Sequence, residues 1–235
     1  MGVKIMNINI YHLIEGAKRA KGLTVIIDVF RAFSLECYLF DMGAKMIRPV
    51  KTIEEAFEWR KKDPDCLLVG ERQGKKCEGF DLGNSPSSAS TELIKGRRII
   101  HTTSAGTQGV VNALCADEII TGSFVNARAV ARYIVDGNYE TVSLVCMGNG
   151  GIREAEEDEL CALYIKSLIE KSEISDIKER LGRLKDSGGA HFFDPLMQEV
   201  FPEADFWMCI DANLFDFVIR VEHDGDGLIS KRILV

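Results

Sequence analysis

The feature that most constrains the fold of this chain is a regular alternation of short apolar runs with helix-like segments. The runs Leu23–Asp28, Cys66–Val69 and Thr141–Cys146 are rich in branched apolar residues, and each ends in a polar or glycine-rich turn. Such runs predict buried strands. Strands that alternate with helices favour parallel pairing, with helices on both faces of the sheet. We therefore predict an α/β fold with three αβα layers around a largely parallel or mixed sheet.

Local signals place the other elements. Thr52 and Glu55 have the spacing of a helix capping box. Two apolar runs flank an Asp-Gly turn at 223–227, which predicts a C-terminal β-hairpin rather than a calcium loop, because the EF-hand spacing is missing. The charged segment 172–189 predicts a solvated helix and loop. The remaining predicted strands are Lys45–Val50, Arg98–His101 and Glu118–Thr121, and the main predicted helices are Ala32–Met42, Ala127–Val135 and Glu154–Ile169.

Length and composition bound the domain organisation. The 235 residues, 46% of them hydrophobic, suffice for one sizeable core, so we expect residues 1–235 to form a single α/β domain. The unit of strand, polar turn and helix recurs after Asp28, at Thr102–Thr107 and at Met147–Gly151. This recurrence is compatible with an internal duplication into two intertwined similar halves, although every doubly wound fold contains the same unit.

Charge and cysteine content exclude several classes of protein. The net charge is −7, with 29 basic and 36 acidic residues scattered along the chain, and a nucleic-acid-binding protein would instead show a basic stripe. No signal peptide and no apolar run of roughly 20 residues is visible, so we expect no membrane partner. The seven cysteines are widely spaced without a CxxC pair, which argues against a zinc site and fits buried thiols in a reducing cytoplasm. The oligomeric state stays open, and a homo-oligomer is compatible with the sequence.

The strand Leu23–Ile27 ends in Asp28-Val29-Phe30-Arg31. Open α/β sheets bind ligands at the carboxyl ends of their strands. A carboxylate there can hold a divalent cation, and a guanidinium can clamp a phosphate or carboxylate with two hydrogen bonds. A simple salt bridge at the strand end is the alternative interpretation.

Three further polar segments follow predicted strands. The turn Thr102–Thr107 opens a helix and is either an anion site or an ordinary helix cap. The irregular stretch from Gly70 to Ser90 contains Glu71 and Asp81 as candidate oxygen ligands, and Asn84 and Ser85 as candidate donors. The acids 156–159 follow a glycine-rich turn; they favour the helix dipole, and they also suit a cation, with Asp158 and then Glu157 as the preferred ligands.

A cysteine-dependent phosphatase is not favoured. Cys66 and Arg72 have the C-x5-R spacing, but the intervening residues are mostly a predicted strand and cannot wrap around a phosphate. The chain also lacks a Walker A loop, and the strand ending at Asp28 lacks the second Asp of the DxD phosphatase motif.

Taken together, these segments resemble the 2-phosphosulfolactate phosphatase family of coenzyme M biosynthesis. The most specific match is Gly79–Pro86, with the sequence GFDLGNSP. At Ser104 the chain departs from the Asn that the pattern favours, the charged segment 172–189 diverges, and the C-terminal match, which includes Asp216, is weaker. The other matching stretches are Ile27–Ala32, Gly70–Arg72, Thr102–Thr107, Gly122–Asn126 and Glu157-Asp158.

The resemblance implies a magnesium-dependent phosphatase that converts 2-phosphosulfolactate, or the phosphate ester of a related 2-hydroxy acid, to the hydroxy acid and phosphate. Side-chain chemistry at the matching positions suggests catalytic roles for Asp28, Arg31 and Asp81. It suggests Asp28, Asp81, Glu157 and Asp158 as Mg²⁺ ligands. Arg31 and the Ser104–Thr107 backbone would hold the phosphate. The other candidate substrate-binding residues are Arg72, Asn84, Ser85, Thr103, Ser104, Gly106, Thr107 and Asn126.

Two alternatives remain at this stage. A non-catalytic binding module for an anionic phosphorylated metabolite would use the same turns and arginines, but it would gain nothing from the surrounding Asp and Glu residues. Within the enzyme interpretation, either water or Asp28 could be the nucleophile, the second through a covalent aspartyl-phosphate.

Overall fold

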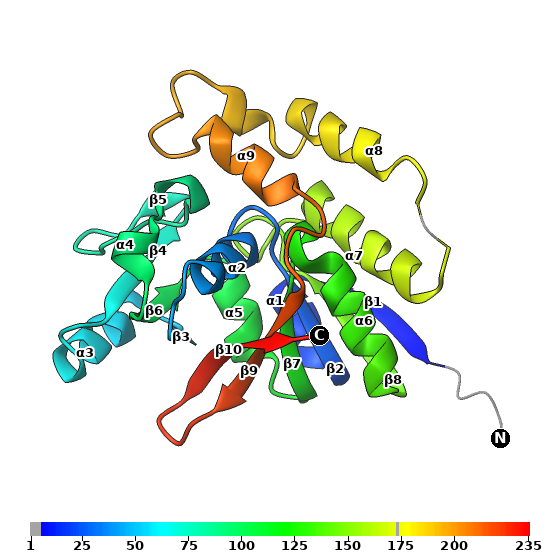
Figure 1. Ribbon diagram of the computed structural model, residues 1–235, viewed down its shortest axis with the longest axis horizontal. Helices are drawn as coiled ribbons and strands as arrows, with labels where there is room; N and C mark the ends of the chain where they lie inside the picture. The colour runs from blue at the N-terminus through cyan, green and yellow to red at the C-terminus, as the bar shows by residue number, and fades with distance from the viewer. Residues whose placement is uncertain (1–5, 173) are drawn as a thin grey trace.

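A mixed ten-stranded sheet forms the centre of the computed structural model, which describes residues 6–172 and 174–235 (Figure 1). The strand order is β1-β8-β2-β7-β9-β10-β3-β6-β4-β5. The predicted α/β fold with three layers and a mixed sheet is confirmed. The strands are β1 (Asn7–His12), β2 (Gly22–Ile27), β3 (Met46–Pro49), β4 (Leu67–Arg72), β5 (Lys75–Lys76), β6 (Arg98–Thr102), β7 (Ala116–Gly122), β8 (Thr141–Cys146), β9 (Phe217–His223) and β10 (Leu228–Leu234).

Helices cover both faces of this sheet. They are α1 (Leu13–Arg19), α2 (Ala32–Asp41), α3 (Ile53–Lys62), α4 (Thr91–Ile94), α5 (Gly106–Asn112), α6 (Ala127–Gly137), α7 (Glu156–Ile169), α8 (Ile177–Arg183) and α9 (Glu203–Ile210). Strand β2 shows why two layers of helices are needed. Its residues Leu23, Val25 and Ile27 pack with α6 and α7, whereas Ile26 packs with α1 and α5 on the other face. A strand buried on both faces has to be apolar throughout.

The C-terminal hairpin β9–β10 connects two parallel parts of the sheet. Strands β1, β8, β2 and β7 pair in parallel on one side, and β3, β6 and β4 on the other. Because β7, β9, β10 and β3 are successively antiparallel, the two parallel parts run in opposite directions. The β10–β3 junction has a single register pair, Ser230 with Ile47. The accumulated twist of a sheet this wide reorients one part relative to the other.

Most predicted elements are present, with three informative differences. Strand β1, helix α1 and helix α9 were not predicted: the sequence of β1, NINIYH, carries few β-branched apolar residues, and α1 and α9 are short. Helix α7 begins at Glu156 rather than Glu154. At the predicted capping box, Thr52 accepts the Glu55 N–H, but the Glu55 carboxylate accepts the N–H of Lys51 instead of Thr52.

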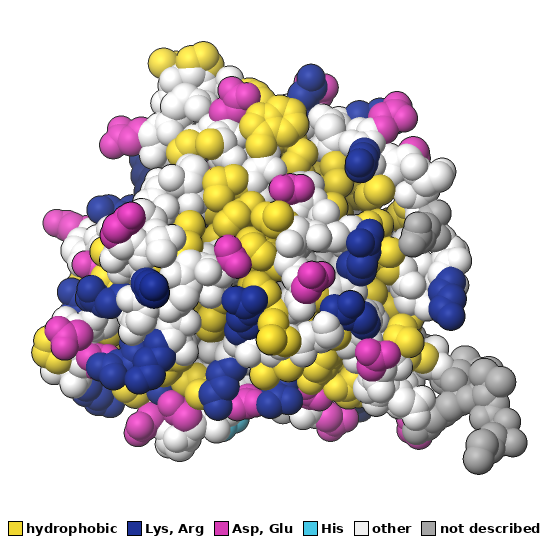
Figure 2. All heavy atoms as spheres, in the orientation of Figure 1, with side chains coloured by type: hydrophobic (Ala, Val, Ile, Leu, Met, Phe, Trp, Pro, Cys, Tyr) yellow, Lys and Arg dark blue, Asp and Glu magenta, His cyan; other side chains and the backbone are white. Residues whose placement is uncertain are grey.

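The charged segment contains α8, as expected, and residue 173 of that segment lies outside the described residues. Basic and acidic side chains are scattered around apolar atoms on the face shown in Figure 2, in agreement with the scattered charges of the sequence. Among residues 6–172 and 174–235, no helix combines the length and apolar character required to cross a bilayer.

Candidate active site

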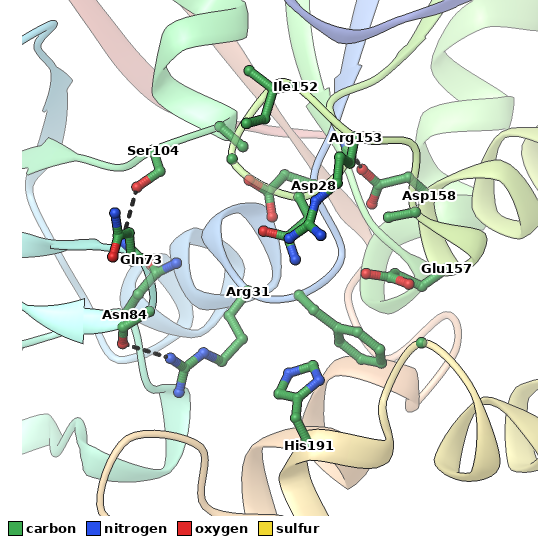
Figure 3. A pocket seen from close by; sticks show the side chains of 18 of the residues that line it. Asp28, Arg31, Gln73, Asn84, Ser104, Ile152, Arg153, Glu157, Asp158 and His191 are labelled. Atoms are coloured by element: carbon green, nitrogen blue, oxygen red, sulfur yellow. Dashed lines mark hydrogen bonds between the residues drawn. The ribbon is translucent and has the colours of Figure 1, made fainter. Parts of the chain in front are cut away.

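A cavity of about 700 Å³ lies where the carboxyl ends of β2, β4 and β6 meet the loop after β8 and the first turn of α7 (Figure 3). The segment that carries Gly188, His191 and Phe201 closes one side of it. Both parallel parts of the sheet therefore contribute strand ends to one cavity, although their strands run in opposite directions. Four buried carboxylates line this cavity: Asp28, Glu71, Glu157 and Asp158.

Asp28 directly follows β2, and its side chain is only 6% exposed. Its Oδ1 accepts the N–H of Ala32, at the start of α2, at 3.2 Å. Burial, together with the nearby Glu71 charge, raises the pKa of Asp28 to about 6. A carboxyl that is partly protonated near neutral pH is an unusual group, and such groups cluster at functional sites.

Glu157 lies in the first turn of α7 and has an unused oxygen. Its Oε2 is buried and accepts no hydrogen bond from the described residues. Burial raises the pKa of Glu157 to about 7, and the charge of Asp28 contributes to this shift. Gly188 lies so close to Oε2 that a Cβ at that position would collide with the oxygen. The chain therefore keeps space around a buried carboxylate oxygen that lacks a protein donor.

Asp158, the next residue, is held by the backbone on both oxygens. Oδ1 accepts the N–H of Val29 at 2.8 Å, and Oδ2 accepts the N–H of Gly148 at 2.7 Å. The side chain thereby fastens the chain after β2 to the chain after β8. Burial raises the pKa of Asp158 well above its usual range, and the charges of Asp28 and Glu157 add to the shift.

Glu71, at the end of β4, is satisfied by donors from the protein. Its Oε1 accepts the N–H of Ser104 at 2.6 Å. Its Oε2 accepts the N–H of Gly74 at 2.6 Å and the Ser104 hydroxyl at 3.2 Å. Three donors compensate for the desolvation of a buried carboxylate.

The turn Thr102–Thr107 uses its donors within the protein. Thr107 donates its N–H to the Thr103 hydroxyl, and Thr103 donates its N–H to the Thr107 hydroxyl. The Ser104 N–H points to Glu71, and a Cβ on Gly106 would lie 2.8 Å from Asp28 Oδ2. These contacts hold the turn together and position the Glu71 and Asp28 carboxylates, although the N-cap residue of α5, Ala105, makes no side-chain cap. The sequence predicted that the backbone N–H groups of Ser104–Thr107 bind phosphate directly. In the structure the Ser104 N–H is already donated to Glu71.

Three cationic or titratable groups face the acids. Arg31 is 3% exposed, and its Nη1 forms an ion pair with Asp205 at 2.6 Å. Its Nη2 donates to the Gly74 carbonyl, so this guanidinium is largely committed to the protein. His191 lies beside Phe201, and burial together with the Arg31 charge lowers its pKa. Arg153 is exposed at the cavity, and no ion pair joins it to a carboxylate of the described residues.

Of the predicted substrate-binding residues, Asn84 and Ser104 line the cavity, and the other six do not. Arg72 donates to the Glu71 carbonyl and the Thr102 hydroxyl. Ser85 donates to Asp205, and Asn126 accepts the N–H of Ser123 in a local cap. Thr103 and Thr107 are occupied with one another, as described above, and Gly106 packs against Asp28.

Asp81, the remaining predicted metal ligand, also lies away from the cavity. The GFDLGNSP segment folds back along β4, where Leu82 bridges to Val69. This return directs Asp81 to the N–H of Leu68 and into an ion pair with Arg60. The structure therefore brings together Asp28, Glu157 and Asp158 from the predicted ligand set, with Glu71 in the fourth position and without Asp81.

Sequence reasoning missed several residues of the cavity, namely Gln73, Arg153, His191 and Phe201. The glycine-rich turn before Arg153 was a usable signal, because such turns after strands tend to be functional. His191 and Phe201 lie in a segment without strand or helix periodicity, so the sequence offered no comparable signal. None of the seven cysteines, all in the described residues, lines the cavity.

The carboxylate set fits a hard divalent cation such as Mg²⁺. Asp28, Glu157 and Asp158 are buried, the Asp28 charge raises the pKa values of the other two, and Glu157 Oε2 has no donor among the described residues. A cation would neutralise this repulsion. No three oxygens of this set lie within 4.8 Å of one another in the described residues. This spacing is compatible with Mg²⁺, which usually keeps several waters and binds one or two carboxylates directly.

Comparison with known proteins identifies the family. The family model described as 2-phosphosulpholactate phosphatase matches residues 8–224. A protein of Bacillus subtilis (strain 168), named "Probable 2-phosphosulfolactate phosphatase", is 32% identical over 91% of this chain and 92% of its own length. Proteins with the same name from Caldicellulosiruptor saccharolyticus and Clostridium botulinum are 39% and 32% identical, over 71% and 88% of this chain and 70% and 91% of their own lengths. The chain that builds this acidic cavity belongs to the 2-phosphosulpholactate phosphatase family.

Proposed function

We propose that this protein is a magnesium-dependent phosphatase that hydrolyses 2-phosphosulfolactate, or the phosphate ester of a related 2-hydroxy acid, to the hydroxy acid and inorganic phosphate. Its family and the names of its relatives support phosphatase activity. The observation that supports a bound metal ion is the Oε2 atom of Glu157. It is buried beside Asp28 and Asp158 and accepts no hydrogen bond from the described residues. A pure anion-binding module would not bury negative charges around its ligand.

Asp28 and Glu157 would hold the Mg²⁺, Glu157 through its Oε2, and Asp158 would assist from its fixed position. The bound ion would neutralise phosphate charge and position the attacking water. Because Mg²⁺ usually binds only one or two carboxylates directly, its other coordination positions would remain for water and substrate.

The substrate would carry a phosphate, a carboxylate and a sulfonate, so it needs cationic partners besides the metal. Arg31 is tied to Asp205 and the Gly74 carbonyl, and Arg72 is directed away from the cavity. Arg153 remains as the exposed guanidinium at the cavity without an ion pair in the described chain. We assign to Arg153 the binding of the substrate sulfonate, or of the second acidic group of a related substrate.

In the reaction, a bond forms between water oxygen and phosphorus, and the bond between phosphorus and the ester oxygen breaks. The water loses a proton, and the leaving alkoxide takes one up. His191 lies at the cavity with a lowered pKa, so it is a neutral imidazole at pH 7 that can accept or deliver this proton. The free thiols of the chain suit a reducing cytoplasm as the compartment of the enzyme.

The test is phosphate release from a panel of phosphorylated 2-hydroxy acids, measured with and without Mg²⁺ after removal of metal by a chelator. Hydrolysis should require Mg²⁺ and should be fastest for a substrate with a second acidic group besides its carboxylate. The Arg153→Ala variant should raise KM for that substrate more than for phospholactate, which lacks the sulfonate. Full activity in the chelated protein would refute the metal proposal, and failure to hydrolyse any member of the panel would refute the enzymatic one.

A further inference from the structure

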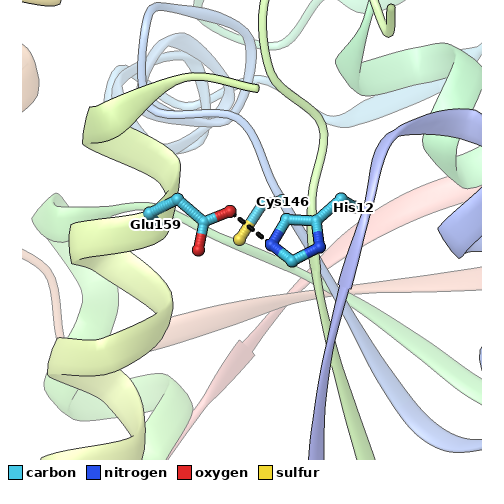
Figure 4. Close-up of side chains that lie close together, drawn as sticks. All are labelled: His12, Cys146 and Glu159. Carbon is cyan, nitrogen blue, oxygen red and sulfur yellow. Dashed lines mark ion pairs between the residues drawn. The ribbon is translucent and has the colours of Figure 1, made fainter. Parts of the chain in front are cut away.

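A second cluster of metal-binding side chains lies outside the oxygen-lined cavity (Figure 4). His12 and Cys146 are the last residues of β1 and β8, and they are direct register partners in the parallel sheet. Glu159 comes from α7, which packs against β8. The three potential ligand atoms lie within 4.8 Å of one another. They form the only such group of three among residues 6–172 and 174–235.

The internal contacts of this cluster leave it incompletely satisfied. His12 Nε2 lies 2.5 Å from Glu159 Oε1, an ion-pair distance. Glu159 Oε1 is nevertheless buried without a partner in hydrogen-bond geometry. The Cys146 thiol is buried and donates a weak hydrogen bond to the Asp158 carbonyl, with the sulfur 3.4 Å from the oxygen. The Cys146 thiol thus lies beside an imidazole and a carboxylate that contact one another outside hydrogen-bond geometry.

We propose that His12, Cys146 and Glu159 form a separate binding site for a borderline divalent ion such as Zn²⁺. Thiolate, imidazole and carboxylate are the three protein ligands of zinc, whereas Mg²⁺ prefers oxygen alone. On binding, the Cys146 thiol would lose its proton to solvent and form the sulfur–metal bond. Three protein ligands leave a fourth tetrahedral position for water. The side chains of His12 and Glu159 are 37% and 32% exposed, which gives the ion a path from solvent.

The sequence argument against a zinc site applied to cysteine-rich structural sites, whose ligands are close together in the chain. Here the ligands are 134 and 13 residues apart, because His12, Cys146 and Glu159 are brought together by parallel pairing and helix packing. The proposal does not depend on the phosphatase function, since it concerns different side chains and its test measures binding.

The test is a Co²⁺ titration of the reduced, tag-free protein in excess Mg²⁺, which occupies the oxygen sites. A cobalt–thiolate bond produces a near-ultraviolet charge-transfer absorption that oxygen and nitrogen ligands do not give. We expect this absorption to saturate at one equivalent of Co²⁺ and to disappear when Zn²⁺ is added. No charge-transfer band at millimolar Co²⁺ would overturn the proposal.

Single-residue variants test which side chains bind the Co²⁺ ion. Cys146→Ser should abolish the band, and His12→Gln and Glu159→Gln should weaken Co²⁺ binding at least about tenfold. Cys115→Ser, at an exposed thiol, and His223→Gln, at an exposed imidazole, are the matched controls and should bind as the parent does. His12 lies at the surface, so its variant decides the question even if Cys146→Ser fails to fold. A band lost in Cys115→Ser, or unchanged affinity in His12→Gln, would contradict the assignment.

Discussion

On the β4–β6 side of the cavity, Glu71 receives hydrogen bonds from three donors, whereas on the α7 side the Oε2 atom of Glu157 receives none from the described residues. Both carboxylates are buried and line the same cavity. Their difference comes from the backbone around them. A turn folds its N–H groups toward Glu71, while the side chain of Glu157 extends from a helix toward the segment at Gly188.

The comparison distinguishes buried acids that organise the site from those that are available to a ligand. A buried carboxylate that accepts hydrogen bonds from the protein needs no cation. A buried carboxylate without such donors destabilises the folded state until a cation binds it. Asp158 belongs with Glu71 by its hydrogen bonds, although it adjoins Glu157 in sequence. We therefore expect Glu157 to govern metal affinity, and Glu71 and Asp158 to govern stability. Asp28, which accepts the N–H of Ala32, is intermediate. The predictions below test this division, from the largest expected effect to the smallest.

The largest effect should be on the pH dependence of unfolding in the metal-free protein. The folded-state pKa values of Asp28, about 6, and Glu157, about 7, lie above their ordinary values. The folded state therefore binds more protons than the unfolded state between about pH 4.5 and 7, and stability should fall as the pH rises through this range. For Glu157 the loss is on the order of 3 kcal/mol, or roughly 6–12 °C in Tm. Thermal melts from pH 5 to 8 measure it.

Mg²⁺ should largely remove this dependence, because the ion binds the ionised carboxylates. His191 works in the opposite direction below pH 6.5, since its lowered pKa makes the folded state less able to take up a proton. The Glu157→Gln variant corrects for this contribution: its melts should be flatter than those of the parent protein over the same range. If the stability of the metal-free protein increased with pH above 6.5, the raised pKa values of Asp28 and Glu157 would be contradicted.

Glu157→Gln should also weaken the response to Mg²⁺. Gln keeps the shape of the side chain but removes the charge that attracts the cation, so the Mg²⁺ concentration for half-maximal activity should rise at least about tenfold, or about 1.4 kcal/mol. A Mg²⁺ titration of phosphate release measures this midpoint. Glu71→Gln is the matched control from the other side of the cavity, and it should shift the midpoint less. Equal shifts in the two variants would remove the distinction between the two sides.

Asp158→Asn should act mainly on stability. One carboxylate oxygen would become an NH₂ group facing a backbone N–H, either that of Val29 or that of Gly148. Leaving one of these donors without an acceptor costs about 1–3 kcal/mol, against which the relief of charge repulsion works. We expect a net loss of about 1 kcal/mol at saturating Mg²⁺, with a smaller change of the Mg²⁺ midpoint than in Glu157→Gln. Chemical denaturation in parallel with the titration separates these effects, and a larger midpoint shift than in Glu157→Gln would restore Asp158 as the principal ligand.

The smallest effect is expected for Asp81→Asn. Its carboxylate pairs with Arg60 at the surface and lies outside the cavity, so the variant should lose less than about 1 kcal/mol of stability. The Mg²⁺ midpoint should not change, and Asp81 thus serves as a negative control for the cavity carboxylates. A raised midpoint would return Asp81 to the metal site and would require the GFDLGNSP segment to move.

The sequence by itself determined the fold class and part of the site. Apolar runs such as Leu23–Ile27 can be buried only as strands covered on both faces, and the Asp-Gly turn predicted the C-terminal hairpin. Asp28, Glu157 and Asp158 were recognised because polar groups at strand ends and helix starts lie where α/β sheets bind ligands. Those rules are local, and the corresponding signals lie within a few residues of each side chain.

Only the tertiary structure decided which of these side chains meet. The hairpin reverses the direction of one parallel part of the sheet, and the twist then brings Glu71 to the cavity with Asp28. The segment after β4 folds back along that strand and so directs Asp81 away from the site. The segment after α8 places His191 at the cavity, opposite the acids. Hydrogen bonds from distant backbone donors, such as Ser104 N to Glu71, determine which buried carboxylates stay open. Such donors depend on strand order and loop path, which no local sequence pattern encodes.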